Sequence, residues 1–361
     1  MRRTQRDSPT QLLRELRAVQ LDPLDPCGNN ADLVAMARVD ELQRGAFLGQ
    51  VYEGAFEHFA KERCVLPADA FPYYAAQAPR RPRFRMASRL ERVPKSALEA
   101  AYMFVDEHGP TSLEKLELGK VESIDWSGWK GTSRAGRMAI EVLVMQGRVV
   151  VCGRKGREKF YDLPRRHLGA LGESNGCSED EFEEWSILER VRAAGLLSEG
   201  AGIWWSSIPR RAAVERLVRS GQLVRLRVEG VRAPLLGAPD NTNNANQEWG
   251  KELPLRLLGP LDPLLWNRRL VRELFDFDYI WEVYKPVESR RFGWYVMPLL
   301  DGDGLVGRIE AKLKDDVLEV SNVWEEQHGS VAPQRLDELL THHAWACGAK
   351  QMVRPLAFRR S

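Results

Sequence analysis

Apolar residues recur at helical spacing near the start of the chain and then give way to alternation. The stretch 8–11 offers an N-cap serine, a proline at the first helical position and a glutamine three residues after the cap. Leu12, Leu13 and Leu16 follow at the spacing of one helix face. The helix predicted here leads directly into residues 18–23, where polar and apolar residues alternate. Alternation predicts an extended segment, because successive strand side chains point to opposite faces.

The alternating segment places two polar groups on one face. Gln20 and Asp22 share that face, and Pro23 disfavours helical backbone at Asp22. An amide beside a carboxylate can hold and polarise one water molecule: the amide orients it, and the carboxylate accepts its proton or stabilises a positive centre nearby. The alternative is a strand face exposed to solvent, or the last turn of a helix, with no chemical role. Gln20 and Asp22 are therefore candidate catalytic residues.

Two later segments repeat one another. Residues 139–150 align without gaps to residues 213–224, and in both a helix ends at a glycine and passes directly into a strand. A helix precedes each copy, at 95–107 and 179–194, and a glycine-containing tip leads each strand into a second one, at 153–157 and 229–232. Helix, turn, helix and two-stranded wing predict a winged helix-turn-helix. Residues 40–66 resemble a degenerate first copy.

The pattern changes to short strands after the Asn-rich stretch 241–247. Strands are predicted at 280–284, 292–298, 304–309 and 317–324, with a hairpin turn at 301–304 and a closing helix at 333–347. Regular spacing of this kind is typical of a small barrel or a curled sheet.

We therefore expect an α+β protein with three tandem winged helix-turn-helix units followed by a small C-terminal β-barrel. The expected boundaries are 1–78 for the first winged-helix unit with the catalytic motif, 79–92 for a basic linker, 93–168 and 178–240 for the second and third units, and 253–361 for the barrel with its terminal helix.

Composition narrows the class of protein. The 361 residues include 53 Lys and Arg against 51 Asp and Glu, so no global basic charge is present, but one basic face can form. Five scattered cysteines without metal-ligand spacing indicate free thiols in a reducing compartment. The sequence lacks GxxxxGK[ST], GxSxG and HExxH motifs, a run of about 18 apolar residues and the apolar region of a signal peptide. These features predict a cytoplasmic protein that uses no metal or cofactor and does not enter membranes.

Basic residues gather at three places that suit a nucleic-acid backbone. They lie in the Pro-broken linker, on the turn and helix of the second unit, and on its wing tip. The candidate phosphate contacts are Arg80, Arg81, Arg83, Lys130, Arg134, Arg137, Arg154, Lys155 and Arg157. The alternative is a solvated linker and a solvated hairpin tip.

Several motifs along the chain resemble the winged-helix DNA glycosylases typified by AlkZ and YcaQ. They are Gln20-Leu21-Asp22, residues 56–62 with Leu66-Pro67, Gly109-Pro110-Thr111 leading to Trp126 and Trp129, residues 161–164, and, most closely, residues 258–269 with Phe277-Asp278-Tyr279. AlkZ-like members carry Gln-x-Gln at the catalytic place and YcaQ-like members carry Gln-x-Asp, which this sequence matches. Where members commonly carry Ser/Ala-His-His or His-Tyr after the motif, this chain has residues 29–32, Asn-Asn-Ala-Asp.

The resemblance implies hydrolysis of the N-glycosidic bond of alkylated purines in double-stranded DNA, notably N7-alkylguanine, and in some members the unhooking of interstrand crosslinks. In that chemistry Asp22 supplies negative charge and activates water, and Gln20 helps to hold the water. No lysine accompanies them, which predicts a monofunctional hydrolase without a strand-cleaving Schiff base. We expect a monomer associated with the nucleoid. The alternative function is a non-enzymatic winged-helix DNA-binding protein, either a regulator or a damage-recognition factor.

Overall fold

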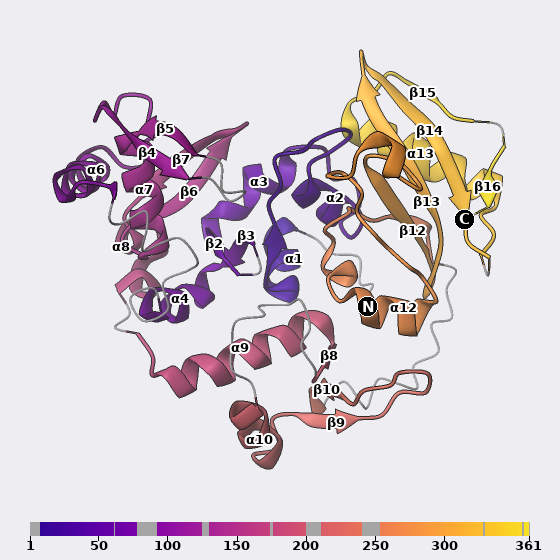
Figure 1. Cartoon of the computed structure of the whole chain (residues 1–361), viewed down its shortest axis with the longest axis horizontal. Helices are drawn as coiled ribbons and strands as arrows, with labels where there is room; N and C mark the ends of the chain where they lie inside the picture. Colours follow the sequence, from indigo (N-terminus) through magenta and orange to yellow (C-terminus); the bar gives the residue numbers. More distant parts are fainter. Residues whose placement is uncertain are drawn as a thin grey trace. The chain divides into compact units, whose positions relative to one another are not determined.

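The two ends of the chain fold together. In the computed structural model of the protein, Met1–Phe47 and Ile187–Ser361 form one compact unit, the terminal unit, and Leu48–Ser186 form another, the middle unit (Figure 1). The structure describes residues 8–60, 62–77, 92–124, 130–173, 176–199, 211–239, 253–327, 329–355 and 357–360, with the backbone alone for 121–124 and 130–133. The Asn-rich stretch 241–247, Trp126 and Trp129 lie outside these residues.

The first helix begins where the sequence predicts. In α1 (Pro9–Leu16), the Ser8 hydroxyl caps the helix by accepting from the Gln11 N–H at 3.2 Å. The leucines at helical spacing are buried, and the helix ends at Arg17 in the left-handed conformation with φ 61°. The chain then extends as β1 (Val19–Gln20) and enters α2 (Asn30–Met36), which Asn29 caps. A capped helix therefore delivers the chain directly to Gln20.

A curled sheet occupies the C-terminal part of the terminal unit. Its strands are β11 (Arg256–Leu257), β12 (Val296–Asp301), β13 (Gly304–Lys314), β14 (Val317–Glu325), β15 (Gln351–Val353) and β16 (Arg359–Arg360). The order is β11-β12-β13-β14-β15, with β16 also on β14, and register shifts interrupt the β12–β13 and β13–β14 pairings. Such irregularities bend a sheet. Among the described strands, β11 and β15 stand at opposite ends of the order and do not pair with each other. The sheet is therefore curled, and the closed barrel that was also predicted is not observed.

The helices of this part agree with the sequence more closely than the strands do. Helix α13 (Pro333–Cys347) has the predicted bounds and ends at Gly348 in the left-handed conformation. The 301–304 hairpin joins β12 to β13. However, the strand predicted at 280–284 is wrong: these residues form a loop between α12 (Arg268–Phe275) and β12. The reason is a side chain: the Glu282 carboxylate accepts from the backbone N–H groups of Arg291 and Phe292, to which the carbonyl oxygens of a strand partner would otherwise bond.

In its described residues the middle unit combines helices with three antiparallel hairpins. It contains η1 (Val51–Gly54), β2 (Ala55–Phe59), β3 (Arg63–Pro67), η2 (Ala68–Ala70), α4 (Phe71–Gln77), α6 (Lys95–His108), β4 (Lys120–Ile124), β5 (Lys130–Arg134), α7 (Ala135–Met145), β6 (Val150–Lys155), β7 (Glu158–Asp162), α8 (Pro164–Leu168) and η3 (Gly169–Glu173). The predicted hairpins at β2–β3 and β6–β7 are present. The β4–β5 hairpin was not predicted. Helices α3 (Ala46–Gln50) and α9 (Glu179–Ala194) cross the boundaries of this unit.

The sequence repeat is a structural repeat at its centre. In the second copy, α10 (Arg211–Arg219) leads into β9 (Val224–Leu226), which joins β8 (Leu196–Ser198) and β10 (Leu235–Gly237) in a three-stranded sheet. Both copies turn at a glycine of positive φ, Gly147 or Gly221. The carbonyl oxygen of Leu143, like that of Leu217, accepts from the N–H groups five and six residues later. The two aligned segments therefore share the same hydrogen-bonded glycine turn between a helix and the following strand.

Candidate active site

Gln20 is buried, and its amide oxygen has acceptor capacity to spare. The side chain is 6% exposed at the end of β1. Its Oε1 is buried and accepts no hydrogen bond from the part of the chain that the structure describes. Buried polar atoms are normally satisfied, by protein or by water. A buried amide oxygen in this condition can accept from a water molecule or a substrate group, and the alternative of an exposed strand face does not fit Gln20.

Asp22 is half-buried two residues further along. Its Oδ1 accepts from the Leu24 N–H at 2.9 Å, a local bond that fixes the carboxylate against the turn at Pro23. Burial raises the pKa of Asp22 above its usual value, and the Leu24 N–H partly opposes the rise. A raised pKa makes a carboxylate a better proton acceptor.

Asn30 holds the backbone beneath this pair. It is fully buried at the start of α2, and its Nδ2 donates to the Gln20 carbonyl oxygen at 2.8 Å. Its Oδ1 accepts from the Leu261 N–H at 3.0 Å. A Cβ added at Gly259 would lie 2.8 Å from the same Oδ1, so this close approach requires glycine. One side chain thus ties the catalytic candidate to the loop at 258–266, the stretch that carries the closest resemblance.

A buried ion pair fixes the same loop. Arg38, just after α2, donates to both oxygens of Asp262 at 2.6 and 2.8 Å. The two side chains are 7% and 0% exposed. A planar guanidinium facing a carboxylate in this way determines orientation as well as distance. The start of α2 and the residues after it are therefore held to the loop by side chains rather than by strand pairing.

The turn after Asp22 is anchored to the sheet and to α13. The Pro26 carbonyl oxygen accepts from the Leu313 N–H at 2.7 Å, and Cys27 Sγ lies 3.9 Å from Met297 Sδ. The Cys27 carbonyl oxygen accepts from the Cys347 thiol at 2.8 Å and lies 3.1 Å from His343 Nε2. Burial lowers the pKa of His343 to about 4, so the imidazole is neutral at pH 7. These contacts hold the Gln20–Asp22 segment from its C-terminal side.

Asp32 is a buried carboxylate that the sequence did not single out. Its Oδ2 accepts from Asn29 Nδ2 at 2.6 Å, and Asn29 Oδ1 accepts from the Asp32 N–H at 3.0 Å. Burial raises the pKa of Asp32 to about 6, and the charge on Asp25 adds to the rise. Asp25 itself binds the Gly28 N–H and Arg44. Asp32 and Asn30 lie in the segment where the chain departs from its resemblance, which was the signal that could have identified them.

The predicted phosphate contacts fall into three groups. Arg80, Arg81 and Arg83 lie outside the described residues, and only the backbone of Lys130 is described. Arg134 and Arg137, at the start of α7, and Lys155 and Arg157, at the β6–β7 turn, are exposed.

Arg154, also predicted as a wing-tip phosphate contact, differs from these exposed residues because it is paired within the middle unit. It donates to both oxygens of the fully buried Glu57, at 2.5 and 2.9 Å, and to the Tyr52 hydroxyl. Burial alone would raise the pKa of Glu57, but Arg154, Lys159 and Arg63 together lower it. The guanidinium is thus the counter-ion of a buried carboxylate.

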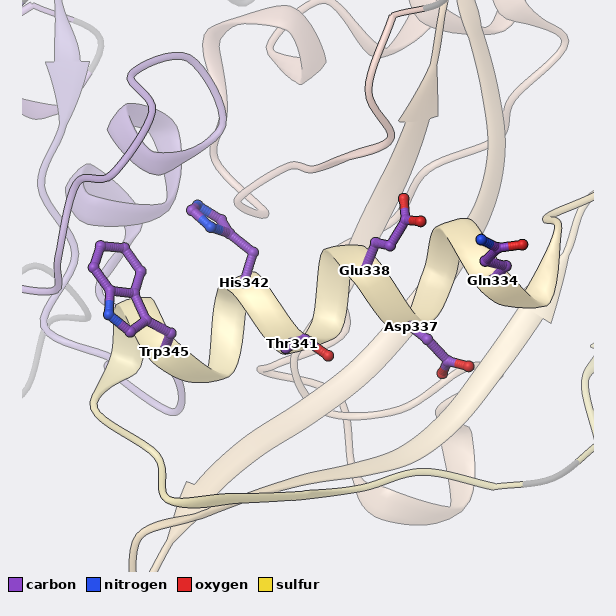
Figure 2. A pocket seen from close by; sticks show the side chains of 6 residues that line it. All are labelled: Gln334, Asp337, Glu338, Thr341, His342 and Trp345. Atoms are coloured by element: carbon purple, nitrogen blue, oxygen red, sulfur yellow. The ribbon is translucent and has the colours of Figure 1, made fainter.

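An open depression runs along the outer face of α13, away from the buried contacts of this helix. It is lined by Gln334, Asp337, Glu338, Thr341, His342 and Trp345 (Figure 2). His342 lies here, whereas the adjacent His343 is buried and faces Cys27, so the two imidazoles do not converge. Two carboxylates line the depression, and Asp337 is paired with Arg354 at 2.5 and 2.9 Å. We assign no part of the chemistry to it.

The described residues were compared with two other classes of protein, metal-binding proteins and membrane-spanning proteins. Within the described residues, no three or more His, Cys, Asp or Glu side chains gather so that they could hold a metal ion. The described helices include none of the length and apolar character that crossing a membrane requires.

Comparison with known proteins identifies the family. The α+β fold is similar to the solved structure of DNA glycosylase AlkZ from Streptomyces sahachiroi, with a TM-score of 0.62 and 18% identity over 98% of this chain and 94% of that chain. A family model described as "DNA glycosylase AlkZ-like" matches residues 13–344, which include Gln20, Asp22 and the 258–269 stretch. Because this match covers most of the chain, it favours the enzymatic interpretation over the non-enzymatic one. The chain belongs to the AlkZ-like family of DNA glycosylases, which are enzymes of DNA repair.

Proposed function

We propose that the protein hydrolyses the N-glycosidic bond of alkylated purines in duplex DNA, with N7-alkylguanine as the substrate and Gln20 and Asp22 as the catalytic residues. The observation that carries the proposal is a half-buried carboxylate that follows, two residues later, a buried amide oxygen without a partner among the described residues. An extended segment positions them two residues apart.

The reaction needs little acid catalysis. An N7-alkylated guanine is cationic, so when the C1′–N9 bond breaks, its electron pair neutralises the departing base. The sugar becomes an oxocarbenium ion, which the Asp22 carboxylate stabilises through its charge. Water then bonds to C1′ and gives its proton to Asp22, while Gln20 Oε1 accepts a hydrogen bond from that water and orients it. The raised pKa of Asp22 assists the proton transfer.

The two repeated segments support the interpretation that parts of the chain are winged-helix units that bind DNA. We propose that 1–78, 93–168 and 178–240 are winged-helix units, that 79–92 is a basic linker, and that the curled sheet of 253–361 is the part predicted as a barrel. Arg134, Arg137, Lys155 and Arg157 are exposed and free to contact phosphate, as proposed also for Lys130, Arg80, Arg81 and Arg83. The proposed active form is a monomer on DNA.

The test is release of a defined base. The protein is incubated with a duplex that carries one N7-methylguanine and, separately, with the same duplex unmodified, and the free base and abasic sites are measured. We expect release from the first duplex alone and its loss in Asp22→Asn. A duplex with an N7-linked interstrand crosslink is the further arm, which asks whether crosslinks are substrates. If N7-methylguanine stays in the duplex while another lesion is released, the proposed substrate is wrong.

A further inference from the structure

The loop before β12 exposes large apolar side chains next to basic ones. Tyr284 is 83% exposed and Val287 is 73% exposed, and Trp294 closes the loop at 37%. Arg291 is also exposed, with its guanidinium 4.7 Å from the centre of the Phe292 ring. Rings that alternate with guanidinium groups are typical of surfaces that bind unstacked nucleotides, because bases stack on rings and cations attract the phosphates.

A buried carboxylate fixes the shape of this loop, residues 284–294. Glu282 is 3% exposed, and it accepts from the N–H groups of Arg291 at 3.1 Å and Phe292 at 2.8 Å and from Lys285 Nζ at 2.8 Å. These donors lower the pKa of Glu282 to about 2, against the effect of burial, so it stays charged at neutral pH. At the far end, the Trp294 N–H donates to Glu310 at 2.7 Å. The exposed rings are therefore presented on a braced loop, which lowers the ordering entropy that binding would require.

A row of aromatic rings leads from this loop to the buried Tyr295, directly before β12. The centre of the Trp281 ring lies 5.7 Å from that of Tyr284 and 6.2 Å from that of Tyr295, and Trp294 lies 6.0 Å from Tyr295. The Trp281 Nε1–H is buried without an acceptor among the described residues. Tyr295 directly precedes β12, in which Met297 Sδ lies 3.9 Å from Cys27 Sγ. Burial raises the pKa of the Tyr295 hydroxyl, and nearby charges, that of Asp22 among them, add to the rise.

We propose that the 284–294 loop receives unstacked nucleotides of the substrate strand, with Tyr284 and Trp294 stacking on bases and Arg291 contacting phosphate. The proposal rests on the proposed function, because the nucleotides assigned to the loop belong to the strand that carries the base to be released. The exposed Arg291 selects the occupant: an apolar protein partner has no use for its charge, whereas a nucleic-acid strand has use for both the rings and the charge. A base that has left the duplex stack needs such a surface in order to pay for its unstacking.

The test compares binding of single-stranded and duplex DNA by full-length variants. Tyr284→Ala and Trp294→Ala should each weaken binding of a short single-stranded oligonucleotide by about 5-fold to 100-fold, the loss expected for one stacked base. Tyr284→Phe keeps the ring and should bind like the wild type. Trp345→Ala is the matched control, since Trp345 is a tryptophan of the same unit that is 45% exposed on α13, and it should also bind like the wild type.

Two further measurements separate this proposal from its alternatives. Arg291→Ala should reduce the slope of log affinity against log salt for single strands by about 0.7. A 2-aminopurine placed beside the lesion should brighten on binding to the wild type and to Asp22→Asn, and brighten less with Tyr284→Ala. If Tyr284→Ala and Trp294→Ala bind single strands as tightly as the wild type, the loop proposal is overturned.

The outcomes distinguish this proposal from the proposed function. If Asp22→Asn is inactive and the ring variants bind normally, the loop assignment fails and the catalytic one stands. If Asp22→Asn is fully active and the ring variants still lose single-strand binding, the catalytic assignment fails and the loop retains its role. If sedimentation shows that Tyr284→Ala converts a dimer into a monomer with DNA binding unchanged, the loop is a contact between copies of the chain, and the proposal is wrong.

Discussion

The Gln20–Asp22 segment and the Glu57 cluster are both polar sites within the core of a unit, yet their hydrogen bonding differs. Glu57 receives donors on both oxygens, from Arg154 and the Tyr52 hydroxyl, and its pKa is lowered. Asp22 has one local backbone donor and a raised pKa, and Gln20 Oε1 has no partner among the described residues. Saturated groups stabilise a fold, whereas groups with unused capacity can bind a water or a substrate. Five experiments test this comparison.

The largest effect is expected from the charge of Asp22. Asp22→Asn keeps the shape but removes the charge and the proton acceptor, so the single-turnover rate of base release should fall by roughly 10²–10⁴-fold. Gln20→Ala should lower it less, because one partner still holds the water. Duplex affinity should stay near the wild-type value in both.

The control for these two variants is Asp303→Asn. Asp303 is exposed in the β12–β13 turn, whereas Asp25 is unsuitable because it binds Arg44 and the Gly28 N–H. Base release by Asp303→Asn should match the wild type. A fully active Asp22→Asn would remove the difference on which the comparison rests.

Glu57 should affect stability instead of chemistry. Glu57→Gln leaves Arg154, whose side chain is 15% exposed, without its counter-ion, and breaking a buried pair in this way destabilises by about 3–5 kcal/mol. Urea unfolding should show the loss, while the folded protein still releases base at the wild-type rate. Glu158→Gln, at an exposed position on β7, should change stability by less than about 0.5 kcal/mol. A large fall in rate with unchanged stability would give Glu57 the role assigned here to Asp22.

Asn30 combines features of the two sites. Its own amide group is hydrogen-bonded at both ends, but it supports the backbone of Gln20, whose side-chain oxygen has no partner among the described residues. Asn30→Ala removes the bonds to the Gln20 carbonyl oxygen and the Leu261 N–H, and kcat should fall by roughly 10-fold to 100-fold as the segment shifts. KM should change little. Asn29→Ala removes the cap of α2 without touching Gln20, so it should lower the melting temperature and spare kcat. Equal kcat values in the two variants would show that Asn30 is structural only.

Asp32 should make the stability of the folded protein depend on pH. Its pKa is raised to about 6 in the folded protein, so folding favours the protonated form. Its contribution to stability is present below the pKa of the unfolded chain, near 4, and is lost as the pH rises through about 6. Asp32→Asn should therefore raise the melting temperature at pH 8 relative to the wild type and have little effect at pH 4. If the difference in melting temperature between Asp32→Asn and the wild type were the same at pH 4 and pH 8, this prediction would be wrong.

The smallest effect is expected at the exposed cations. Reversing the charge of Arg137, Lys155 and Arg157 should weaken duplex binding similarly for all sequences and reduce the salt slope by about 0.9 per lost contact. Arg211→Glu, at an exposed position on α10, serves as a comparison in the third predicted winged-helix unit. An unchanged slope in the triple variant would exclude these three residues from the interface.

Local features were predictable from the sequence, and long-range ones were not. The Ser8 cap, the glycine turns at Gly147 and Gly221 and the bounds of α13 depend on residues close in sequence. The roles of Asn30 and Arg154 depend on partners 231 and 97 residues away, so no local pattern could reveal them. The strand predicted at 280–284 failed for a different reason: the N–H groups of Arg291 and Phe292, only nine and ten residues away, donate to the Glu282 side chain and not to strand carbonyl groups.

The bond from Asn30 to Leu261 also has a consequence for synthesis. Gln20 and Asp22 leave the ribosome early, but Leu261, Leu313 and His343, whose contacts hold the segment, follow hundreds of residues later. Closing contacts of such sequence separation is slow and must await most of the chain. A nascent or prematurely terminated chain therefore carries the Gln20–Asp22 segment without the contacts that support it.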